Sequence, residues 1–368
     1  MRISYDCQAF VLQSYGGISR YFTRLVQGML QLNHQVGIFA PLHRNNYLLS
    51  LPREVVFGRY LSSYPKKTAR FFLAYNQFLS HAKIAKWKPN LVHETYYSRH
   101  RSAPRECPTV ITVYDMIQEL YANEMTLTDN TATNKRIAIE RADHVICISE
   151  NTKLDLMRLY GTPASKISVV HLGFDQFEAQ AYAHRSSAFS RKPFLLYVGQ
   201  RAGYKNFIGF LKAVAISKKL LDDFDIVAFG GKKFSSDELH IINSLDFSDS
   251  QVRHISGGDD LLGGLYNEAS AFVYPSIYEG FGIPPLEAMA HRCPVISSNT
   301  SSMPEVIGSA GEYFNPTDIE DMRRAIEEVV YSKSRTDDLR RLGDSRLTEF
   351  SWDKCSKETM NVYRSLAG

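Results

Sequence analysis

Short apolar runs of strand length alternate with helix-like segments along the whole chain, in two successive series. The runs of the first series are Arg2–Tyr5, Gln35–Ala40, Leu91–His93, Thr109–Val113, His144–Ile148 and Ile167–Leu172. Those of the second are Phe194–Val198, Asp225–Phe229, Val252–Ile255, Ala271–Tyr274, Pro294–Ser297 and Glu312–Phe314. Buried strands of parallel sheets read as continuous apolar runs, and helices between them, here expected from about Ile18 and over Glu150–Tyr160, give the βαβ pattern. The sequence therefore predicts an α/β protein with two parallel sheets.

A polar stretch separates the two series. It holds Arg185-Ser186-Ser187 and Arg191-Lys192-Pro193, a composition typical of a linker. The chain has 368 residues, which is too long for one ordinary hydrophobic core. We therefore predict an N-terminal domain over residues 1–175, a linker over 176–193, a C-terminal domain over 194–350 and a final segment over 351–368.

Composition narrows the functional classes. A net charge of +4 and a hydrophobic content of 44% are typical of a soluble globular protein and give no nucleic-acid signature. The 5 cysteines are scattered, without a C-x-x-C pair or a cluster at metal-ligand spacing, which favours a reduced compartment and no metal site. No signal-like start and no run of 18 apolar residues occur. We expect a cytoplasmic protein.

Residues 275–305 carry two carboxylates, Glu279 and Glu287, on either side of a glycine-proline turn. A helix is expected from Pro284, because prolines are tolerated in the first helical turn. The loop Gly280–Ile283 can turn backbone N–H groups toward a ligand, and a helix N-terminus favours an anion. Two interpretations stand at this point: a ligand cradle, or a Glu279 that caps the helix beside a solvated Glu287.

Cations and glycines follow other predicted strands. Arg201 and Lys205 lie four apart after Phe194–Val198, where they would neutralise a diphosphate or simply be solvated. Gly16 and Gly17 follow the first strand and either bring N–H groups near a phosphate or form a plain turn.

The motif E-G-F-G-I-P-P-L-E, with its E-x₇-E spacing, resembles the retaining family-4 glycosyltransferases of GT-B architecture. The stretches Y-V-G-Q-R-A-G-Y-K-N and Y-G-G-I-S-R-Y resemble bacterial mannosyltransferase-like enzymes of O-antigen and exopolysaccharide assembly. The resemblance implies two Rossmann-like domains that face each other across a cleft. It also implies that a final helix, Lys354–Leu366, crosses back to the N-terminal domain; the residues alone equally fit a plain surface helix.

The resemblance also implies roles for the site residues. Arg201 and Lys205 would hold the diphosphate of a nucleotide sugar, Glu279 would orient the donor sugar, and Glu287 would bind the ribose hydroxyls. The other donor-binding positions would be Gly16, Gly17, Gly230, Phe281, Gly282 and Ile283. No cofactor and no metal are implied, because the nucleotide sugar is a substrate and the cations carry the charge of the leaving group.

Two segments are candidates for the acceptor or the donor sugar. Where many relatives carry His-Asp, this chain has Tyr114 and Asp115; a phenol with a pKa near 10 is a poor base, so only positioning is expected of Tyr114. Asp115 either serves a sugar or caps a helix. The segment His93–Arg101, which includes Tyr96, gathers imidazoles, cations and aromatic rings. It would stack a sugar ring or meet an acceptor phosphate, or else be packed within the fold.

The first donor candidate is GDP-mannose or a related GDP-sugar, with UDP- and dTDP-sugars open. The acceptor class is a glycan or lipid-linked saccharide of cell-surface polysaccharide biosynthesis. Two other classes stay open: a nucleotide-sugar epimerase or phosphorylase of the same fold, and a non-catalytic carbohydrate- or nucleotide-binding module.

One segment suggests a membrane partner. From Val55 to His93 there is no acidic residue, and seven basic residues occur: Arg59, Lys66, Lys67, Arg70, Lys83, Lys86 and Lys88. Within this segment Phe71, Tyr75, Phe78 and Ala82 recur at helical spacing. Residues 59–88 are therefore expected to form a basic amphipathic helix that rests on the anionic inner face of the cytoplasmic membrane. The alternative is a core-facing helix with a solvated basic back.

Overall fold

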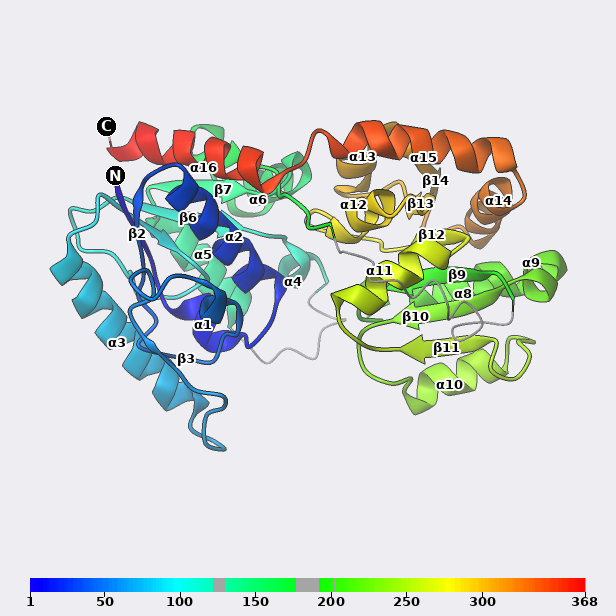
Figure 1. Cartoon of the computed structure of the whole chain (residues 1–368), viewed down its shortest axis with the longest axis horizontal. Helices are drawn as coiled ribbons and strands as arrows, with labels where there is room; N and C mark the ends of the chain where they lie inside the picture. The colour runs from blue at the N-terminus through cyan, green and yellow to red at the C-terminus, as the bar shows by residue number, and fades with distance from the viewer. Residues whose placement is uncertain (122–129, 177–191, 202, 368) are drawn as a thin grey trace. The chain divides into compact units, whose positions relative to one another are not determined.

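The structure, a computed structural model, describes residues 1–121, 130–176, 192–201 and 203–367, without the side chains of residues 69 and 70. The chain divides into two compact units (Figure 1). Unit 1 comprises Met1–Gly173 and Ser351–Gly368, and unit 2 comprises Phe174–Phe350. Most of the predicted linker over 176–193 lies outside the described residues.

Unit 1 contains a six-stranded parallel sheet in the order β2-β1-β5-β6-β7-β8. Its strands are β1 (Arg2–Tyr5), β2 (Gln35–Ile38), β5 (Leu91–Glu94), β6 (Thr109–Val113), β7 (His144–Cys147) and β8 (Ile167–Val169). A short pair, β3 (Leu42–His43) and β4 (Arg59–Tyr60), lies outside this sheet. The strand order reverses between β1 and β5. Open α/β sheets bind ligands beyond the carboxyl ends of strands at such a switch point.

The helices of unit 1 surround this sheet. They are α1 (Gln8–Leu12), α2 (Gly17–Gln31), α3 (Ala69–Trp87), α4 (Ile117–Leu120), α5 (Thr131–Arg141), α6 (Glu150–Tyr160) and α16 (Trp352–Ala367), with 3₁₀ turns η1 (Tyr47–Ser50) and η3 (Ala164–Lys166). The bounds of α6 follow from its caps. The Ser149 side chain accepts from the Thr152 N–H at the start, and Gly161 takes a left-handed φ of 67° at the end.

The last helix, α16, belongs to unit 1 and lies beside α2 (Figure 1). Its buried face includes Cys355, Met360 and Tyr363. The Tyr363 hydroxyl lies 2.6 Å from Nδ1 of His93 in β5 and 3.2 Å from the hydroxyl of Tyr5 in β1. The prediction that the final helix returns to the N-terminal domain is confirmed, and the plain surface helix is wrong because one face of α16 is buried in unit 1.

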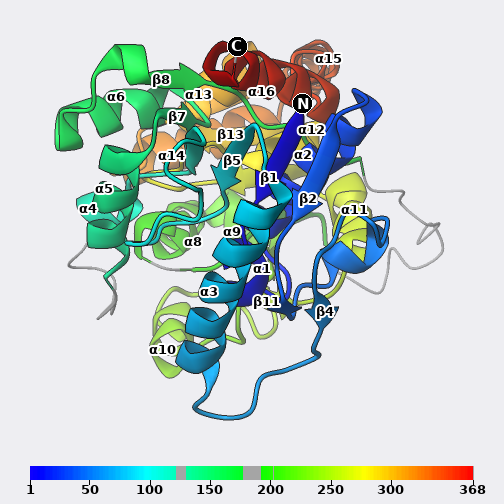
Figure 2. The ribbon, with the colours of Figure 1, turned by 90° about the vertical axis from the view of Figure 1, so that its left-hand side faces the viewer.

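Helix α3 runs across the face of unit 1 that Figure 2 turns toward the viewer. Asn76, Ser80 and Ile84 point into the unit and are buried. The apolar stripe faces outward instead: Phe71 is 68% exposed, Tyr75 41% and Phe78 73%. The core-facing interpretation of this stripe is therefore wrong. The expected helix over residues 59–88 is also too long, because Arg59–Tyr60 form β4 and α3 begins only at Ala69. None of the helices within the described ranges is long and apolar enough to span a bilayer.

Unit 2 has a second parallel sheet, also of six strands, in the order β11-β10-β9-β12-β13-β14. Its strands are β9 (Phe194–Val198), β10 (Asp225–Phe229), β11 (Val252–Ile255), β12 (Ala271–Tyr274), β13 (Val295–Ser298) and β14 (Gly311–Phe314). In sequence order this is 3-2-1-4-5-6, the Rossmann arrangement, and its switch point lies between β9 and β12. Two Rossmann-like parallel sheets were predicted, and both are present.

Helices cover the unit 2 sheet. They are α8 (Phe207–Ala215), α9 (Lys218–Asp223), α10 (Ser236–Asn243), α11 (Asp259–Glu268), α12 (Ile283–Ala290), α13 (Met303–Ile307), α14 (Ile319–Val330) and α15 (Lys333–Leu347), with 3₁₀ turns η4 (Gly203–Lys205) and η5 (Gly308–Ala310). Phe210 of α8 and Ile326 of α14 pack with Ile226 and Val273 of the sheet in one core cluster. This core fixes the strand ends from which the site residues project.

Candidate functional site

The switch point of unit 2 brings Lys205 and Glu279 together. Lys205 ends η4, which follows β9, and Glu279 lies in the loop between β12 and α12. The Lys205 Nζ lies 2.6 Å from Oε1 and 2.8 Å from Oε2 of Glu279, although the residues are 74 positions apart. Only 19% of the lysine side chain and 9% of the glutamate side chain are exposed. A hydrogen-bonded ion pair with so little solvent is among the stronger electrostatic contacts of a protein.

The loop that carries Glu279 is held by two serines. The Ser301 hydroxyl donates to the Glu279 carbonyl at 2.6 Å and accepts from its N–H at 3.2 Å. The Ser302 hydroxyl lies 2.9 Å from the Glu279 carbonyl and 2.8 Å from that of Phe281. The Tyr274 hydroxyl bonds the Glu279 side chain, and burial, followed by the Glu279 charge, raises the pKa of Tyr274 well above 10. Glu279 is therefore pre-positioned by the fold.

Helix α12 begins at Ile283, one residue earlier than expected, with Pro284 in its first turn. Its N-cap is Gly282, whose φ of 103° favours glycine, and no side chain caps the helix. Glu287 is only 6% exposed and is hydrogen-bonded to Tyr266. A helix-capping Glu279 and a solvated Glu287 are therefore both wrong.

Arg201 has a different set of partners from Lys205. Its Nε lies 2.6 Å from Oε1 of Glu238, and its terminal nitrogens donate to the carbonyls of Gly230 and Lys232. The guanidinium lies 4.8 Å from the ring centroid of Phe234, and the side chain is 5% exposed. Burial alone would raise the pKa of Glu238, but hydrogen bonds from Arg201 and Ser235 hold it below its usual value. Arg201 and Lys205 are thus not a solvated pair.

A pocket of about 710 Å³ lies beside Arg201 in unit 2. It is lined by Gln200, Arg201, Gly231, Lys232, Lys233, Ser235 and Glu238. Gly230 has a φ of 84°; its N–H donates to the Ile255 carbonyl at 2.9 Å, and its carbonyl accepts from Arg201 and from His254. Lys205 and Glu279 do not line this pocket, so unit 2 presents two polar regions near its strand ends.

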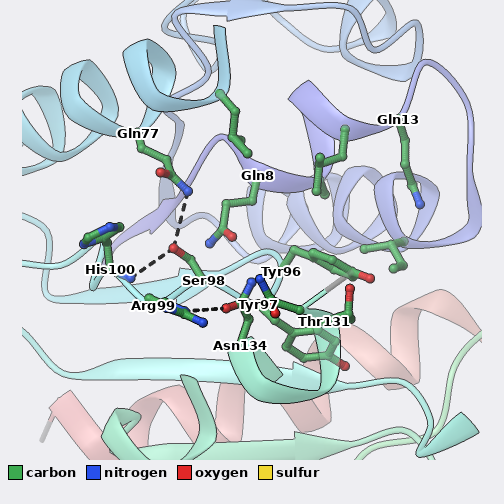
Figure 3. A pocket seen from close by; sticks show the side chains of 15 residues that line it. Gln8, Gln13, Gln77, Tyr96, Tyr97, Ser98, Arg99, His100, Thr131 and Asn134 are labelled. Atoms are coloured by element: carbon green, nitrogen blue, oxygen red, sulfur yellow. Dashed lines mark hydrogen bonds between the residues drawn. The ribbon is translucent and has the colours of Figure 1, made fainter. Parts of the chain in front are cut away.

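The switch point of unit 1 holds a pocket of about 530 Å³ (Figure 3). Its walls are Gln8, Ala9, Leu12, Gln13, Ile18, Leu73, Gln77, Tyr96, Tyr97, Ser98, Arg99, His100, Asn130, Thr131 and Asn134. Gln8 and Ala9 follow β1, and Tyr96–His100 follow β5. Both the place and the size are typical of a small-molecule site, for which ~300–1,000 Å³ is usual.

Two buried carboxylates anchor this pocket from behind. Asp6 accepts from the Gln8 amide at 2.7 Å, from the Thr95 N–H at 3.0 Å and from the Ser102 hydroxyl at 2.6 Å. Glu94 accepts from the Ser102 N–H at 2.7 Å and is paired with Arg141. Burial raises the pKa of Glu94, while Arg141 opposes this shift. Because Ser102 bonds both carboxylates, the loop between β5 and Ser102 is tied to the ends of β1 and β5.

Of the predicted sugar or acceptor residues, Tyr96 lines this pocket, whereas Tyr114 and Asp115 do not. Burial raises the pKa of Tyr114 well above 10, which agrees with a residue that only positions others. Asp115 Oδ1 accepts from the Ile117 N–H at 3.0 Å, at the start of α4. The helix-capping interpretation of Asp115 is therefore the one its contacts favour.

The glycine pair after β1 starts α2, with Gly16 as N-cap and Gly17 as the first residue. Gln13 Oε1 accepts from the Ser19 N–H at 3.1 Å, so a side chain of this chain occupies that donor. A Cβ on Gly16 would overlap the Gln13 side chain, whereas a Cβ on Gly17 would meet nothing within 4 Å. The closeness of the Gln13 side chain explains why a glycine stands at position 16. No neighbouring atom explains the glycine at position 17.

Sequence reasoning missed most of the pocket residues in unit 1. Neutral amides line much of it, namely Gln8, Gln13, Gln77, Asn130 and Asn134, and they come from separate segments with no motif. The available signal was the segment His93–Arg101, which supplies Tyr96–His100. In the described part of the chain, no group of three or more His, Cys, Asp or Glu side chains is placed to hold a metal ion.

Comparison with known families gives a match for each half of the chain. Residues 15–176 match the family described as Glycosyltransferase Family 4. Residues 180–345 match the family described as Glycosyl transferases group 1.

Named relatives are similar over larger parts of the chain. An O-antigen chain mannosyltransferase B of Escherichia coli is 28% identical over 241 residues, which are 62% of this chain and 62% of that protein. The chain thus spans less than two thirds of the length of that relative. An O-antigen chain mannosyltransferase RfbU of Salmonella typhimurium is 26% identical over 320 residues, 85% of this chain and 87% of that protein.

Solved structures share the architecture of the whole chain. A sucrose-phosphate synthase from Thermosynechococcus elongatus superposes with a TM-score of 0.76 at 20% identity, covering 99% of this chain and 98% of the other. WaaG, a glycosyltransferase involved in lipopolysaccharide biosynthesis, gives 0.71 at 15% identity, with 99% of both chains covered. Anabaena HepE in complex with UDP and glucose gives 0.74 at 14% identity, covering 99% of this chain and all of that one. At these identities the likeness establishes the fold.

Proposed function

The chain belongs to the family-4 glycosyltransferases of GT-B fold, and we propose that it moves a hexose from a nucleotide sugar to a saccharide acceptor, with retention and without a metal. GDP-mannose or a related GDP-sugar is the first donor candidate, because similar proteins are named mannosyltransferases. The acceptor class is a glycan or lipid-linked saccharide in cell-surface polysaccharide synthesis. The Lys205–Glu279 pair at the unit 2 switch point is the observation that carries the proposal.

Lys205 is the proposed contact for the departing diphosphate. Its side chain is only 19% exposed, so its attraction for a second negative group is stronger than in water. In the structure both carboxylate oxygens of Glu279 lie within hydrogen-bond distance of this ammonium. A bound diphosphate would compete for the ammonium and release the carboxylate to accept hydrogen bonds from donor-sugar hydroxyls.

The nucleotide half of the donor is assigned to Glu287 and the loop before it. Glu287 lies in the second turn of α12 and is proposed to accept from the ribose hydroxyls. The backbone of Phe281–Ile283 approaches the N-terminus of α12, whose partial positive charge favours phosphate or sugar oxygens.

Arg201 can contact the diphosphate only if it first gives up its present partners. Its contacts with Glu238 and two carbonyls must be exchanged before it can hold a phosphate directly. We therefore assign the direct contact first to Lys205 and expect Arg201 to matter less for leaving-group stabilisation.

We propose that the acceptor oxygen attacks the anomeric carbon from the face that the leaving group vacates. The configuration at that carbon is therefore retained. The acceptor oxygen forms a bond to the anomeric carbon as the bond to the diphosphate oxygen breaks. The departing phosphate oxygen takes the acceptor's proton, so no protein base is needed. Tyr114, with its raised pKa, is consistent with this step because it would not serve as that base.

Two carboxylate variants test these roles. Glu279→Gln keeps the side-chain size but loses the charge, and we expect kcat to fall about 10–100-fold with nucleotide affinity nearly unchanged. Glu287→Ala should weaken nucleotide binding about 10–100-fold, because it removes charge-assisted hydrogen bonds. The measurements are product formation from GDP-mannose, UDP-glucose and a dTDP-sugar, with titration of the matching nucleotides. Unchanged activity and affinity in both variants would remove this site from the mechanism.

The same assays separate the other function classes. An epimerase would alter the sugar of the nucleotide without a glycosylated acceptor, and a phosphorylase would require inorganic phosphate. A binding module would bind the nucleotide without turnover.

We also propose that the outer face of α3 rests on an anionic membrane. The exposed aromatic rings of Phe71 and Phe78 lie within a segment rich in lysine and free of acidic residues from Val55 to His93. Flotation with vesicles containing phosphatidylglycerol should recover the wild type, and a Phe71→Ser/Phe78→Ser variant should float less. Leu154→Ser is the matched control, because Leu154 is 61% exposed on α6. Failure of the wild type to float would contradict the proposal.

A further inference from the structure

The unit 1 pocket has an uneven distribution of charge. None of the described residues that line it is Asp or Glu, yet Arg99 and His100 are among them. Figure 3 shows that Arg99, His100, Ser98 and Gln77 gather on one side, whereas Gln13 lies across the pocket. The pocket therefore has a cationic side and a neutral side.

Arg99 has no carboxylate partner in the part of the chain that the structure describes. Its Nε donates to Oδ1 of Asn134 at 3.1 Å, which fixes the stem of the exposed guanidinium on the pocket wall. The neighbouring Arg101 differs, because it lies 3.3 Å from Asp143 and donates to the Cys107 carbonyl. The charge of Arg101 is thus balanced by a carboxylate of the fold, whereas that of Arg99 is not.

The backbone beside Arg99 is held in place by Ser98. The Ser98 hydroxyl accepts from the His100 N–H at 3.1 Å and from the Gln77 amide at 3.3 Å. A second hollow of about 440 Å³ adjoins this side and shares Gln77 and His100 with the pocket. Its other lining residues, Ala74, Phe78, His81, Arg101 and Ser102, include no acid either. Among the described residues, the absence of carboxylates thus extends to the lining of this second hollow.

The neutral side has the chemistry of a sugar site. Amide groups of Gln8, Gln13 and Asn134 offer donors and acceptors that suit hydroxyls, and Tyr96 offers an aromatic ring. Gln8 is oriented by its bond to the buried Asp6. A neutral sugar would use these groups but would leave the charge of Arg99 without a role.

We propose that the unit 1 pocket binds an acceptor saccharide that carries an anionic group, a phosphate or a carboxylate, held by Arg99 and His100. The sugar ring lies among Gln8, Gln13 and Tyr96. This inference rests on the proposed glycosyl transfer, because it specifies the chemistry of the acceptor. The guanidinium fork suits a phosphate or a carboxylate, and the described lining residues include no acid that would repel either.

Ligand-observed saturation-transfer NMR on the full chain tests the proposal with three probes. Mannose 6-phosphate supplies the phosphate, methyl glucuronide supplies the carboxylate, and methyl α-mannoside is the neutral reference. Saturating GDP or UDP occupies the unit 2 cations during the titration. We expect at least one anionic probe to bind about tenfold or more tightly than the neutral one. The anionic probe that binds more tightly shows whether the site prefers a phosphate or a carboxylate. Equal affinity for all three probes, or binding of none, would overturn the proposal.

Variants locate the anion. Arg99→Gln should abolish the anionic preference, Arg99→Lys should keep part of it, and His100→Gln should reduce it as a second, independent change. Arg105→Gln is the matched control, since Arg105 is an exposed arginine of the same unit that lines neither hollow. An anionic preference that survives both Arg99→Gln and His100→Gln would overturn the assignment.

Failure here is distinguishable from failure of the proposed function. If glycosyl transfer is right and this inference wrong, nucleotides stabilise the protein while the probes show no charge preference. If the inference is right and glycosyl transfer wrong, the preference depends on Arg99 although no nucleotide sugar is consumed.

Discussion

The two switch points share a topology but differ in their charges. In unit 2 a cation and a carboxylate, Lys205 and Glu279, meet each other at the strand ends. In unit 1 the carboxylates Asp6 and Glu94 are buried behind the loop, and the pocket itself is lined by amides, aromatic rings and the cation of Arg99. A ligand of unit 2 must therefore compete with an internal ion pair. A ligand of unit 1 meets side chains that the buried carboxylates already hold in position.

This difference suggests a division of labour. An unpaired buried cation would be costly in the free enzyme, and the ion pair between Lys205 and Glu279 avoids that cost. A diphosphate that replaces Glu279 can still bind strongly to the lysine. A wall of amides fixed by buried carboxylates suits recognition of hydroxyls. In our proposal, the carboxyl edge of the sheet serves a charged donor in unit 2 and a polar acceptor in unit 1.

The largest expected effect tests the charge in unit 2. Lys205→Ala should lower kcat about 10²–10³-fold, because it removes a largely buried positive group from the proposed site of the leaving diphosphate. Lys212→Ala is the matched control, since Lys212 is exposed on α8. Thermal unfolding of both variants separates lost activity from lost folding. A wild-type kcat in Lys205→Ala would contradict the proposal that the unit 2 switch point differs from that of unit 1 by binding a charged group through this lysine.

The next effect concerns the strand that leads into the unit 1 pocket. His93 of β5 is fully buried between Tyr363 and Thr112, and burial lowers its pKa to about 3. Its folded pKa is depressed, so below pH ~6.5 the unfolded chain takes up a proton that the folded chain does not. This group should cost about 2 kcal/mol of stability between pH 7 and pH 5.

Urea unfolding at these two pH values measures that loss. Both tryptophans, Trp87 and Trp352, belong to unit 1, so their fluorescence reports on this unit. In His93→Gln the pH-dependent loss should shrink by about 2 kcal/mol, even if the variant is less stable overall. A variant with the same pH slope as the wild type would contradict the assignment of a neutral, structural His93.

The smallest effect separates two glycines at the edge of the unit 1 pocket. Gly16→Ala must displace the amide end of the flexible Gln13 side chain, and with it the bond to the Ser19 N–H, and should cost about 0.5–2 kcal/mol of stability. Gly17→Ala meets open space at the start of α2 and should change stability by less than about 1 kcal/mol. If Gly17→Ala nevertheless loses activity, a ligand approaches that backbone. Equal destabilisation by both substitutions would contradict the packing described here.

The strands could be predicted well because buried parallel strands leave little choice of residue. Thr109–Val113 is a continuous apolar or β-branched run, Asp225–Phe229 is apolar after its first residue, and both have the bounds expected from the sequence. Ile167–Leu172 was expected to be longer than the observed Ile167–Val169, because an apolar run does not show where pairing stops.

The site was less predictable because side-chain partners come from distant segments. Arg201 and Lys205 were grouped by their spacing, yet one contacts Glu238 and the other Glu279. Helical spacing found the stripe of Phe71 and Phe78 but did not show which way it faces. Exposure depends on the neighbouring elements, and periodicity along one helix carries no information about them.

The most direct test of the account is thermal unfolding of the full chain with GDP, UDP, ADP and dTDP in parallel, for the wild type and Lys205→Ala. A nucleotide at about 100 times its dissociation constant should add about 2.7 kcal/mol of stability. We predict selective stabilisation of the wild type by GDP, which is lost in Lys205→Ala. Selectivity for UDP or dTDP would replace the GDP-sugar donor but keep the enzyme class. If none of the four nucleotides shifts the transition, the donor site proposed around Lys205 and Glu279 is contradicted.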